Sequence, residues 1–217
     1  MIPSGEPSGH SRNALTHVAF PIDAQYYIWH KDVSGAILLD RLISAADRGV
    51  RVRILVDDTQ IMDSRKTTAA LNLHPNIEVR SFNPFVSKTI LGFTRALEFV
   101  IHLDRLNHRM HNKLMVADNA VAIVGGRNIG DEYFGLHRDT NFRDMDLIAA
   151  GPIAADVSHS FDLYWKSGWA FAPKAFYSEK PDEKEGRGFT QAAEEIGKLM
   201  KETKKRTADC FTLFCAN

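Results

Sequence analysis

Residues 111–134 read HNKLMVADNAVAIVGGRNIGDEYF, and the fold prediction starts from this stretch. It contains two apolar runs, 111–118 and 120–126, which are joined tightly at Asp118-Asn119 and therefore predict two strands with a short turn between them. The segment NIGDEYFG that follows predicts a helical turn. Polar residues lie at the start of the first predicted strand and directly after the second, so the stretch also carries the candidate chemistry.

The rest of the chain extends this pattern in both directions. Strands are predicted over 22–29, 50–58, 76–82 and 145–151, and helices over 34–49, 66–73 and 152–166. Within 34–49 the apolar residues recur at helical spacing, and Gly49 ends the helix. Alternating strands and helices are typical of an α/β fold. We expect a mixed β-sheet flanked by helices on both faces.

Composition divides the chain into three parts. Residues 1–19 are rich in Ser, Gly and Pro and predict a disordered segment without the features of a signal peptide. Residues 20–172 form the predicted domain. Residues 173–217 are charged and turn-rich, and predict a linker and tail that are partly helical. Within the domain, residues 85–109 mix basic, aromatic and aliphatic residues, which fits a segment on an anionic membrane surface and an ordinary packed helix equally well.

Charge and cysteine content exclude several classes of protein. The 27 basic and 27 acidic residues give a net charge of zero, so bulk electrostatics do not favour a nucleic-acid partner. The two cysteines, Cys210 and Cys215, are too few for a disulfide framework or a zinc site of their own. No run approaches the roughly 20 apolar residues that a membrane-spanning helix needs.

A group of polar residues in 111–128 indicates phosphoryl transfer. His111 and Lys113 lie two residues apart on a predicted strand, so both side chains point to one face. Asp118 ends the strand and either orients Lys113 or anchors the turn. The turn Gly125-Gly126-Arg127-Asn128 lets backbone approach a ligand closely and offers an amide donor. Each feature alone is common in structural positions, but the joint pattern H-x-K-x(4)-D followed by G-G-x-N is specific.

This stretch resembles the HKD motif of the phospholipase D superfamily. The resemblance extends to QYYIWHKD, AADRGVRVRILVDD, SFNPF, DRLNHRMHNK and RDMDLIAAGP, which are similar to the first half of bacterial cardiolipin synthases of the phospholipase D type. It implies that His111 is the nucleophile that forms a phosphohistidine. It also implies that Lys113 and Asn128 hold the phosphoryl oxygens, and that Asp118 completes the motif.

The resemblance also implies an acidic partner for the nucleophilic histidine on the strand after the motif. Asp144 and Asp146 both fill that place, and the spacing favours Asp144. A carboxylate that fixes the tautomer of an imidazole makes it a competent nucleophile. No cofactor and no divalent metal are expected, and the sequence presents no metal-ligand cluster.

The superfamily uses two such motifs, because a second histidine protonates the leaving alkoxide. This chain has nine histidines but a single H-x-K context. We expect either a truncated two-motif enzyme, which the resemblance to long lipid enzymes favours, or a homodimer with its site on the twofold axis. The expected function is a phosphatidyltransferase half-domain that acts on phospholipids, with phosphatidylglycerol as acceptor. The alternatives are a homodimeric phosphodiesterase or nuclease and an inactive fragment. The resemblance implies a cytoplasmic protein that associates peripherally with the inner membrane and does not bind nucleic acid.

Overall fold

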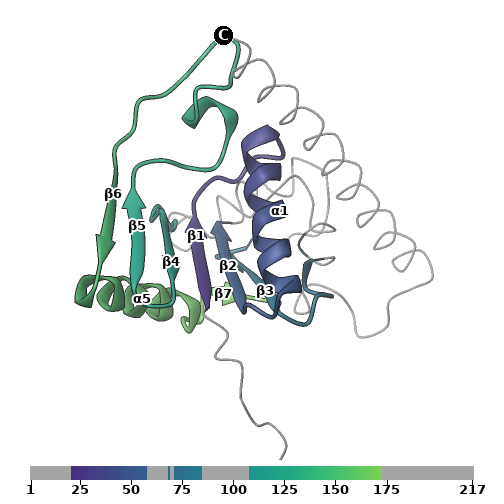
Figure 1. Ribbon diagram of the computed structural model, residues 1–217, viewed down its shortest axis with the longest axis vertical. Coiled ribbons are helices and arrows are strands. Elements are labelled where there is room, and N and C mark those ends of the chain that lie inside the picture. Colours follow the sequence, from purple (N-terminus) through teal and green to yellow (C-terminus); the bar gives the residue numbers. More distant parts are fainter. Residues whose placement is uncertain (1–20, 58–67, 69–70, 85–107, 173–217) are drawn as a thin grey trace, which may run out of the picture.

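A seven-stranded mixed sheet forms the centre of the molecule (Figure 1). The computed structural model describes residues 21–57, 68, 71–84 and 108–172. The strand order is β6-β5-β4-β1-β2-β3-β7. The bounds are Ile22–Tyr26 (β1), Val52–Asp57 (β2), Ile77–Phe82 (β3), Leu114–Ala117 (β4), Val121–Gly125 (β5), Asp146–Ala150 (β6) and Ala170–Phe171 (β7). Strands β1, β2 and β3 run parallel, and the other pairs are antiparallel.

Helices α1 (Val33–Asp47) and α5 (Pro152–Trp165) cover opposite faces of the sheet. Strand alternation explains the two layers: Ile54 packs in the core beneath α1, whereas its neighbour Leu55 packs in the core beneath α5. Figure 1 shows α1 running alongside β1, β2 and β3, and α5 lying across the lower end of the sheet. The predicted fold class, a mixed sheet with helices on both faces, is confirmed.

Local sequence signals explain two boundaries. The carboxylate of Asp32 accepts a hydrogen bond of 2.9 Å from the backbone N–H of Gly35 and so caps α1. Asp118 and Asn119 connect β4 to β5 with φ values of 59° and 53°. Two successive left-handed residues are typical of a type I′ hairpin turn, and Asn and Asp tolerate this conformation better than most residues. The tight turn expected from the sequence is confirmed.

Two predicted strands were too long. The strand expected over 22–29 ends at Tyr26, and the strand expected over 111–118 begins only at Leu114. The sheet register gives the reason for the second difference. Leu114 pairs with Gln25 of β1 and with Val124 of β5, and these are the last ladder partners on either side. His111 therefore lies beyond the regular ladder, in a segment without strand geometry.

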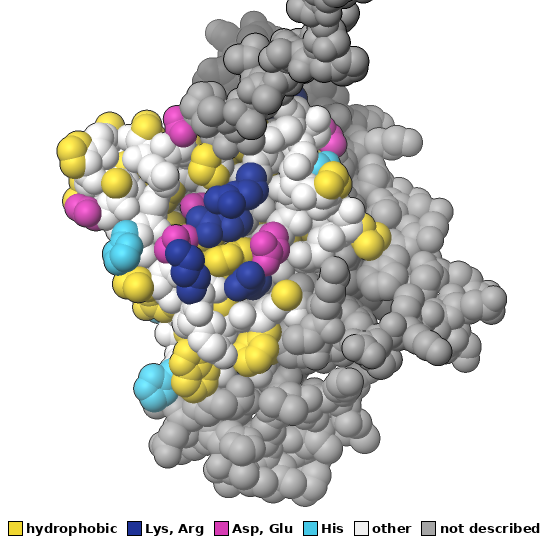
Figure 2. Space-filling view, turned by 90° about the horizontal axis from the view of Figure 1, so that it is seen from below, with side chains coloured by type: hydrophobic (Ala, Val, Ile, Leu, Met, Phe, Trp, Pro, Cys, Tyr) yellow, Lys and Arg dark blue, Asp and Glu magenta, His cyan; other side chains and the backbone are white. Residues whose placement is uncertain are grey.

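Charged side chains pair with one another where the starts of β1 and β2 meet the last turn of α5. Arg53 of β2 contacts Asp23 of β1 at 2.7 Å and Asp162 of α5 at 2.8 Å, and Lys166 contacts Asp162 at 2.7 Å. Arg53 also stacks 4.8 Å from the centre of the Phe161 ring. Figure 2 views the molecule from this end and shows basic side chains beside acidic and apolar ones. Asp23, Arg53, Asp162 and Lys166 are called the Arg53 cluster below.

Several expectations lie outside the described residues. These are the disordered segment 1–19, most of the short helix 66–73, most of the stretch 85–109, and the linker and tail 173–217. Among the described parts of the chain, no helix is long and apolar enough to span a bilayer.

Candidate active site

A pocket of about 320 Å³ lies where β1 ends, β4 begins, β5 ends and β6 begins. Its lining includes five of the residues singled out in the sequence together with three others. The eight are His111, Lys113, Gly126, Asn128, Tyr133, Phe142, Arg143 and Asp144. Residues more than 30 positions apart in the chain therefore meet in one polar pocket.

His111 and Lys113 are in direct contact. The Lys113 ammonium lies 2.8 Å from Nδ1 of His111 and donates a 2.8 Å hydrogen bond to its backbone carbonyl. The Tyr27 ring packs against the imidazole with 4.9 Å between ring centres. Two neighbouring side chains on a regular strand would stand side by side, whereas here Lys113 folds back over His111. An imidazole and an ammonium group thus share one position from which both can reach the same phosphate.

Burial shapes the electrostatics of Lys113. Lys113 is only 7% exposed, whereas His111, which lines the same pocket, is exposed. Burial lowers the pKa of the Lys113 ammonium because it penalises the charged form, and the nearby Asp144 carboxylate partly opposes this effect. The pocket therefore holds an incompletely compensated cation, which an anionic phosphoryl group would stabilise.

The segment before His111 is anchored by Asp57, a fully buried residue at the end of β2. Its carboxylate accepts a hydrogen bond of 3.2 Å from the Met110 backbone N–H and contacts the Arg109 guanidinium at 3.3 Å. Met110 is itself fully buried. These contacts hold the chain in place one residue before the imidazole. Asp57 therefore has a structural role, because it fixes the backbone from which His111 projects.

Asn128 is held by the backbone and by a tyrosine. Its side-chain oxygen accepts a hydrogen bond of 3.0 Å from the Ile28 N–H, and its Nδ2 donates one of 3.1 Å to the Tyr133 hydroxyl. The first bond sets which way the amide faces, so Nδ2 is the donor on the side of Tyr133. An amide Nδ2 carries two hydrogens, and the second is available to a ligand oxygen.

The two acidic candidates have different surroundings. Asp144 lines the pocket, and one of its oxygens lies so close to Gly126 that a Cβ there would come within 2.5 Å of it. Asp146 instead forms an ion pair of 2.8 Å with Arg127 and lies against Gly125. Of the two, Asp144 is the one that lines the pocket with His111 and acts electrostatically on Lys113. The two glycines are required because the acidic strand passes directly over them.

Arg127, Gly125 and Asp118 do not line the pocket. Arg127 donates hydrogen bonds to the backbone carbonyls of Tyr133 and Asp144, so it ties together the two segments that form the pocket wall. Asp118 lies in the β4–β5 turn, at the opposite end of β4 from His111, and its N–H bonds to the Pro21 carbonyl. Of the two roles expected for Asp118, its position fits an anchor for the turn and not a group that orients Lys113.

Sequence reasoning missed four residues around the pocket: Tyr27, which packs on His111, and Tyr133, Phe142 and Arg143, which line the cavity. Tyr27 and Tyr133 lie within the quoted stretches QYYIWHKD and NIGDEYF, but nothing in their spacing marks them as site residues. Arg143 directly precedes Asp144 and adds a second cation to the lining.

The fold and the pocket define an α/β domain with a histidine–lysine site, and comparison with known families identifies its class. The family described as "Cardiolipin synthase, PLD-like domain" matches residues 21–165. Because this match covers well over half of the chain, the protein belongs to that family of phospholipase D-like domains.

Relatives of this chain include proteins named as cardiolipin synthases. It is 46% identical over 144 residues to cardiolipin synthase C of Escherichia coli (strain K12), and this match covers 66% of this chain and 30% of that protein. It is 35% identical over 156 residues to cardiolipin synthase 2 of Staphylococcus epidermidis, covering 71% and 30% respectively. The solved phosphatidylserine synthase of Haemophilus influenzae shares the fold, with a TM-score of 0.51 at 15% identity over 84% of this chain and 38% of that one. The chain thus spans about a third of the length of these relatives.

Proposed function

We propose that residues 20–172 form one catalytic half of a phosphatidyltransferase of the cardiolipin synthase type. The observation that carries the proposal is the contact of the His111 imidazole with the buried Lys113 ammonium, in a pocket that Asn128 and Asp144 also line. His111 attacks the phosphorus of a phospholipid, and a phosphohistidine forms as the lipid alcohol leaves. The hydroxyl of a second lipid, phosphatidylglycerol, then takes the phosphatidyl group and regenerates His111.

The surroundings of the phosphoryl group support this division of roles. Lys113 and the free hydrogen of Asn128 Nδ2 stabilise charge on the non-bridging oxygens. Asp144 fixes the tautomer of the His111 imidazole and offsets the charge of Lys113. Arg143 is exposed beside the pocket and is suited to bind the remainder of an anionic headgroup.

The half-site needs a proton donor for the leaving alkoxide, and we propose that a second phospholipase D-like half supplies it, either in a longer chain or in a second copy. A positioned general acid contributes roughly 10²–10⁴-fold to such a step. Exposed apolar side chains on the chain that follows β5 and on the edge strand β6 support a covering partner. They are Phe134, Leu136, Phe142, Met145, Leu147 and Ile148, each more than 40% exposed. Exposed apolar patches on soluble domains often mark interfaces. Part of this surface is also suited to a peripheral contact with membrane lipid.

A choice of leaving group tests the proposal. A nitrophenyl phosphodiester needs no proton on its leaving group, so the 217-residue chain should release about one nitrophenolate per His111 in a rapid burst. A dialkyl phosphodiester of the lipid type should react with the dimer or two-half protein but not with the monomer. Burst kinetics of the wild type and of His159→Ala, an exposed helix residue, serve as reference and control.

The outcomes separate the possible functions. A burst that survives in His111→Ala would overturn the assignment of the nucleophile. Multiple turnover of a phospholipid by a species that light scattering shows to be monomeric would contradict the missing general acid. Turnover of a dinucleotide phosphodiester by a dimer, without lipid transfer, would favour the nuclease alternative.

A further inference from the structure

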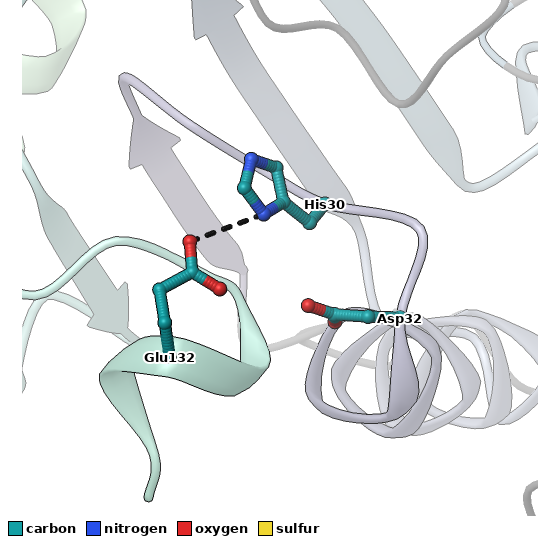
Figure 3. Close-up of side chains that lie close together, drawn as sticks. All are labelled: His30, Asp32 and Glu132. Carbon is teal, nitrogen blue, oxygen red and sulfur yellow. Dashed lines mark ion pairs between the residues drawn. The ribbon is translucent and has the colours of Figure 1, made fainter. Parts of the chain in front are cut away.

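A second group of polar side chains lies outside the pocket lining. It forms where the connection between β1 and α1 meets the turn that follows β5. His30, Asp32 and Glu132 each present one ligand atom, and these atoms all lie within 4.8 Å of one another (Figure 3). Nδ1 of His30 lies 3.2 Å from Oε1 of Glu132. Among the described residues, no other three histidine, cysteine or acidic side chains lie so close together.

The scaffold under these residues is rigid. The His30 N–H donates a 2.8 Å hydrogen bond to the Ile129 carbonyl, and the Ile129 N–H donates one of 3.2 Å to the Ile28 carbonyl. The Asp131 N–H donates a 2.6 Å hydrogen bond to Oδ2 of Asp32. Two segments about 100 residues apart in sequence are therefore locked together, and their side chains meet without further rearrangement of the backbone.

Each of the two segments contains a glycine that a ligand residue of the same segment passes closely. A Cβ at Gly130 would lie 2.8 Å from Oε2 of Glu132, and a Cβ at Gly35 would lie 1.9 Å from the His30 carbonyl oxygen. Contacts under 3.0 Å are too short for a real Cβ, so any other residue would displace Glu132 or His30. The side-chain positions of the group thus depend on glycine at both places.

We propose that His30, Asp32 and Glu132 bind a divalent transition-metal ion, with Zn²⁺ as the best fit. One imidazole with two carboxylates is a mixed nitrogen and oxygen donor set, which suits zinc, whereas Mg²⁺ and Ca²⁺ prefer oxygen ligands only. Two carboxylates balance the ion's two positive charges. The His30 side chain is 40% exposed and that of Glu132 15%, which leaves a side open for water as a fourth ligand.

The distances fit the proposal after a small adjustment. Ligand atoms at about 2.1 Å from a zinc ion in tetrahedral geometry are about 3.4 Å apart. The separation of 3.2 Å between His30 and Glu132 already matches that value. A pair at the upper limit of 4.8 Å would have to close by about 1.4 Å, which requires rotation of the side chains concerned. Asp32 keeps its backbone hydrogen bonds, because each carboxylate oxygen has a second lone pair.

The ion would act on the pocket indirectly. Glu132 directly precedes Tyr133, and the hydroxyl of Tyr133 accepts the hydrogen bond from Asn128. A metal that joins Glu132 to His30 would therefore fix the segment that carries two pocket residues. It would take no part in the attack at phosphorus.

Titration of the metal-free full-length chain with Zn²⁺ tests the site. We expect one saturable equivalent by calorimetry, and affinity reduced more than about tenfold in Glu132→Gln and in His30→Ala. Asp32→Asn should also weaken binding while it keeps the helix cap, because Asn is as good a cap as Asp. Substitution with Co²⁺ should give the visible absorption of a low-coordinate site, and this absorption should be lost in Glu132→Gln.

His74→Ala is the matched control. His74 also contacts a carboxylate, Asp47, at 3.2 Å, but the described residues place no third ligand beside them, so its loss should leave the affinity unchanged. Thermal unfolding in chelator shows whether each variant is folded. If His30→Ala does not fold, Glu132→Gln still tests the site, because it preserves the size of the side chain. Equal Zn²⁺ affinity in the wild type and in Glu132→Gln, or the absence of saturable binding, would overturn the proposal. Neither result depends on phosphatidyl transfer, so the two proposals can fail separately.

Discussion

The two ends of the sheet both gather opposite charges, but they do so in different ways. In the Arg53 cluster the guanidinium contacts two carboxylates, and Lys166 contacts one of them. In the pocket the Lys113 ammonium is buried against an imidazole, a carbonyl and a tyrosine ring, with Asp144 as its main electrostatic counterweight. The pKa values move in opposite directions: that of Arg53 is raised and that of Lys113 is lowered.

The difference follows from hydrogen bonding. Burial acts to lower the pKa of Arg53, but hydrogen bonds and attraction from Asp23 and Asp162 outweigh it. At Lys113, by contrast, burial prevails and lowers the pKa, because Asp144 only partly opposes it. A compensated cation stabilises the fold, whereas an undercompensated one is costly unless a ligand provides the missing negative charge. The comparison assigns a structural role to the Arg53 cluster and a binding role to the pocket.

The largest expected effect is at His111. His111→Ala should abolish the nitrophenolate burst, because no other side chain in the proposed mechanism attacks phosphorus, while the midpoint of thermal unfolding stays within a few degrees. The side chain is exposed, so its removal leaves no buried cavity. Stopped-flow absorbance and circular dichroism give both quantities. If the variant lost folded protein and activity to the same extent, the role of His111 would be structural and not catalytic.

The next largest effect is on stability at the other end of the sheet. Arg53→Ala should lower the free energy of unfolding by about 3–5 kcal/mol, because it leaves the Asp23 carboxylate, 3% exposed, without its partner. Arg80→Ala is the matched control. Arg80 pairs with Glu78, which is 46% exposed, and it should cost about 1 kcal/mol. Urea denaturation measures both, and equal costs would show that burial of the carboxylate does not matter.

A pH-dependent effect follows from the same cluster. Burial acts to raise the pKa of Asp162, but hydrogen bonds from Lys166 and Arg53 prevail and lower it. A carboxylate with a lowered folded-state pKa contributes stability above its unfolded value of about 3.8, and this contribution is lost as pH falls through the folded value. Asp162→Asn should therefore destabilise the protein at pH 7, and the difference from wild type should diminish below the unfolded value of 3.8 as pH falls through the lower folded-state pKa. A constant difference across that range would show that packing, not charge, is responsible.

Much of this architecture was predictable from sequence, for physical reasons that also mark the limits. Apolar runs bounded by turn residues located β2, β3, β5 and β6, and Asp118-Asn119 marked the tight turn, because these signals are local. The extent of β4 was not predictable, since it is set by where its partners Gln25 and Val124 end. Tyr27, which follows β1, packs on His111, and Asp57, at the end of β2, anchors the residue before it, and both lie far from the motif in sequence. The His30 group was missed for the same reason: Glu132 lies 102 positions after it, and only the fold brings the two together.

The smallest expected effect concerns the cost of the buried ammonium. Lys113→Met should abolish phosphate binding in the pocket and yet raise the free energy of unfolding at pH 7 by about 1 kcal/mol. The folded-state pKa of Lys113 lies below its ordinary value of 10.5, so the cost of burying the charge is fully present at neutral pH. It diminishes as pH rises through the folded value, because the folded state then loses its proton more readily than the unfolded state. The stability advantage of Lys113→Met over wild type should therefore narrow in alkaline solution.

Lys166→Met is the control, because that side chain is 71% exposed and its replacement should bring no gain in stability. Urea denaturation at pH 7 and at about pH 10 measures the difference. If Lys113→Met is less stable than wild type at pH 7, the hydrogen bonds of the ammonium outweigh its burial, and the pocket is a compensated site like the Arg53 cluster.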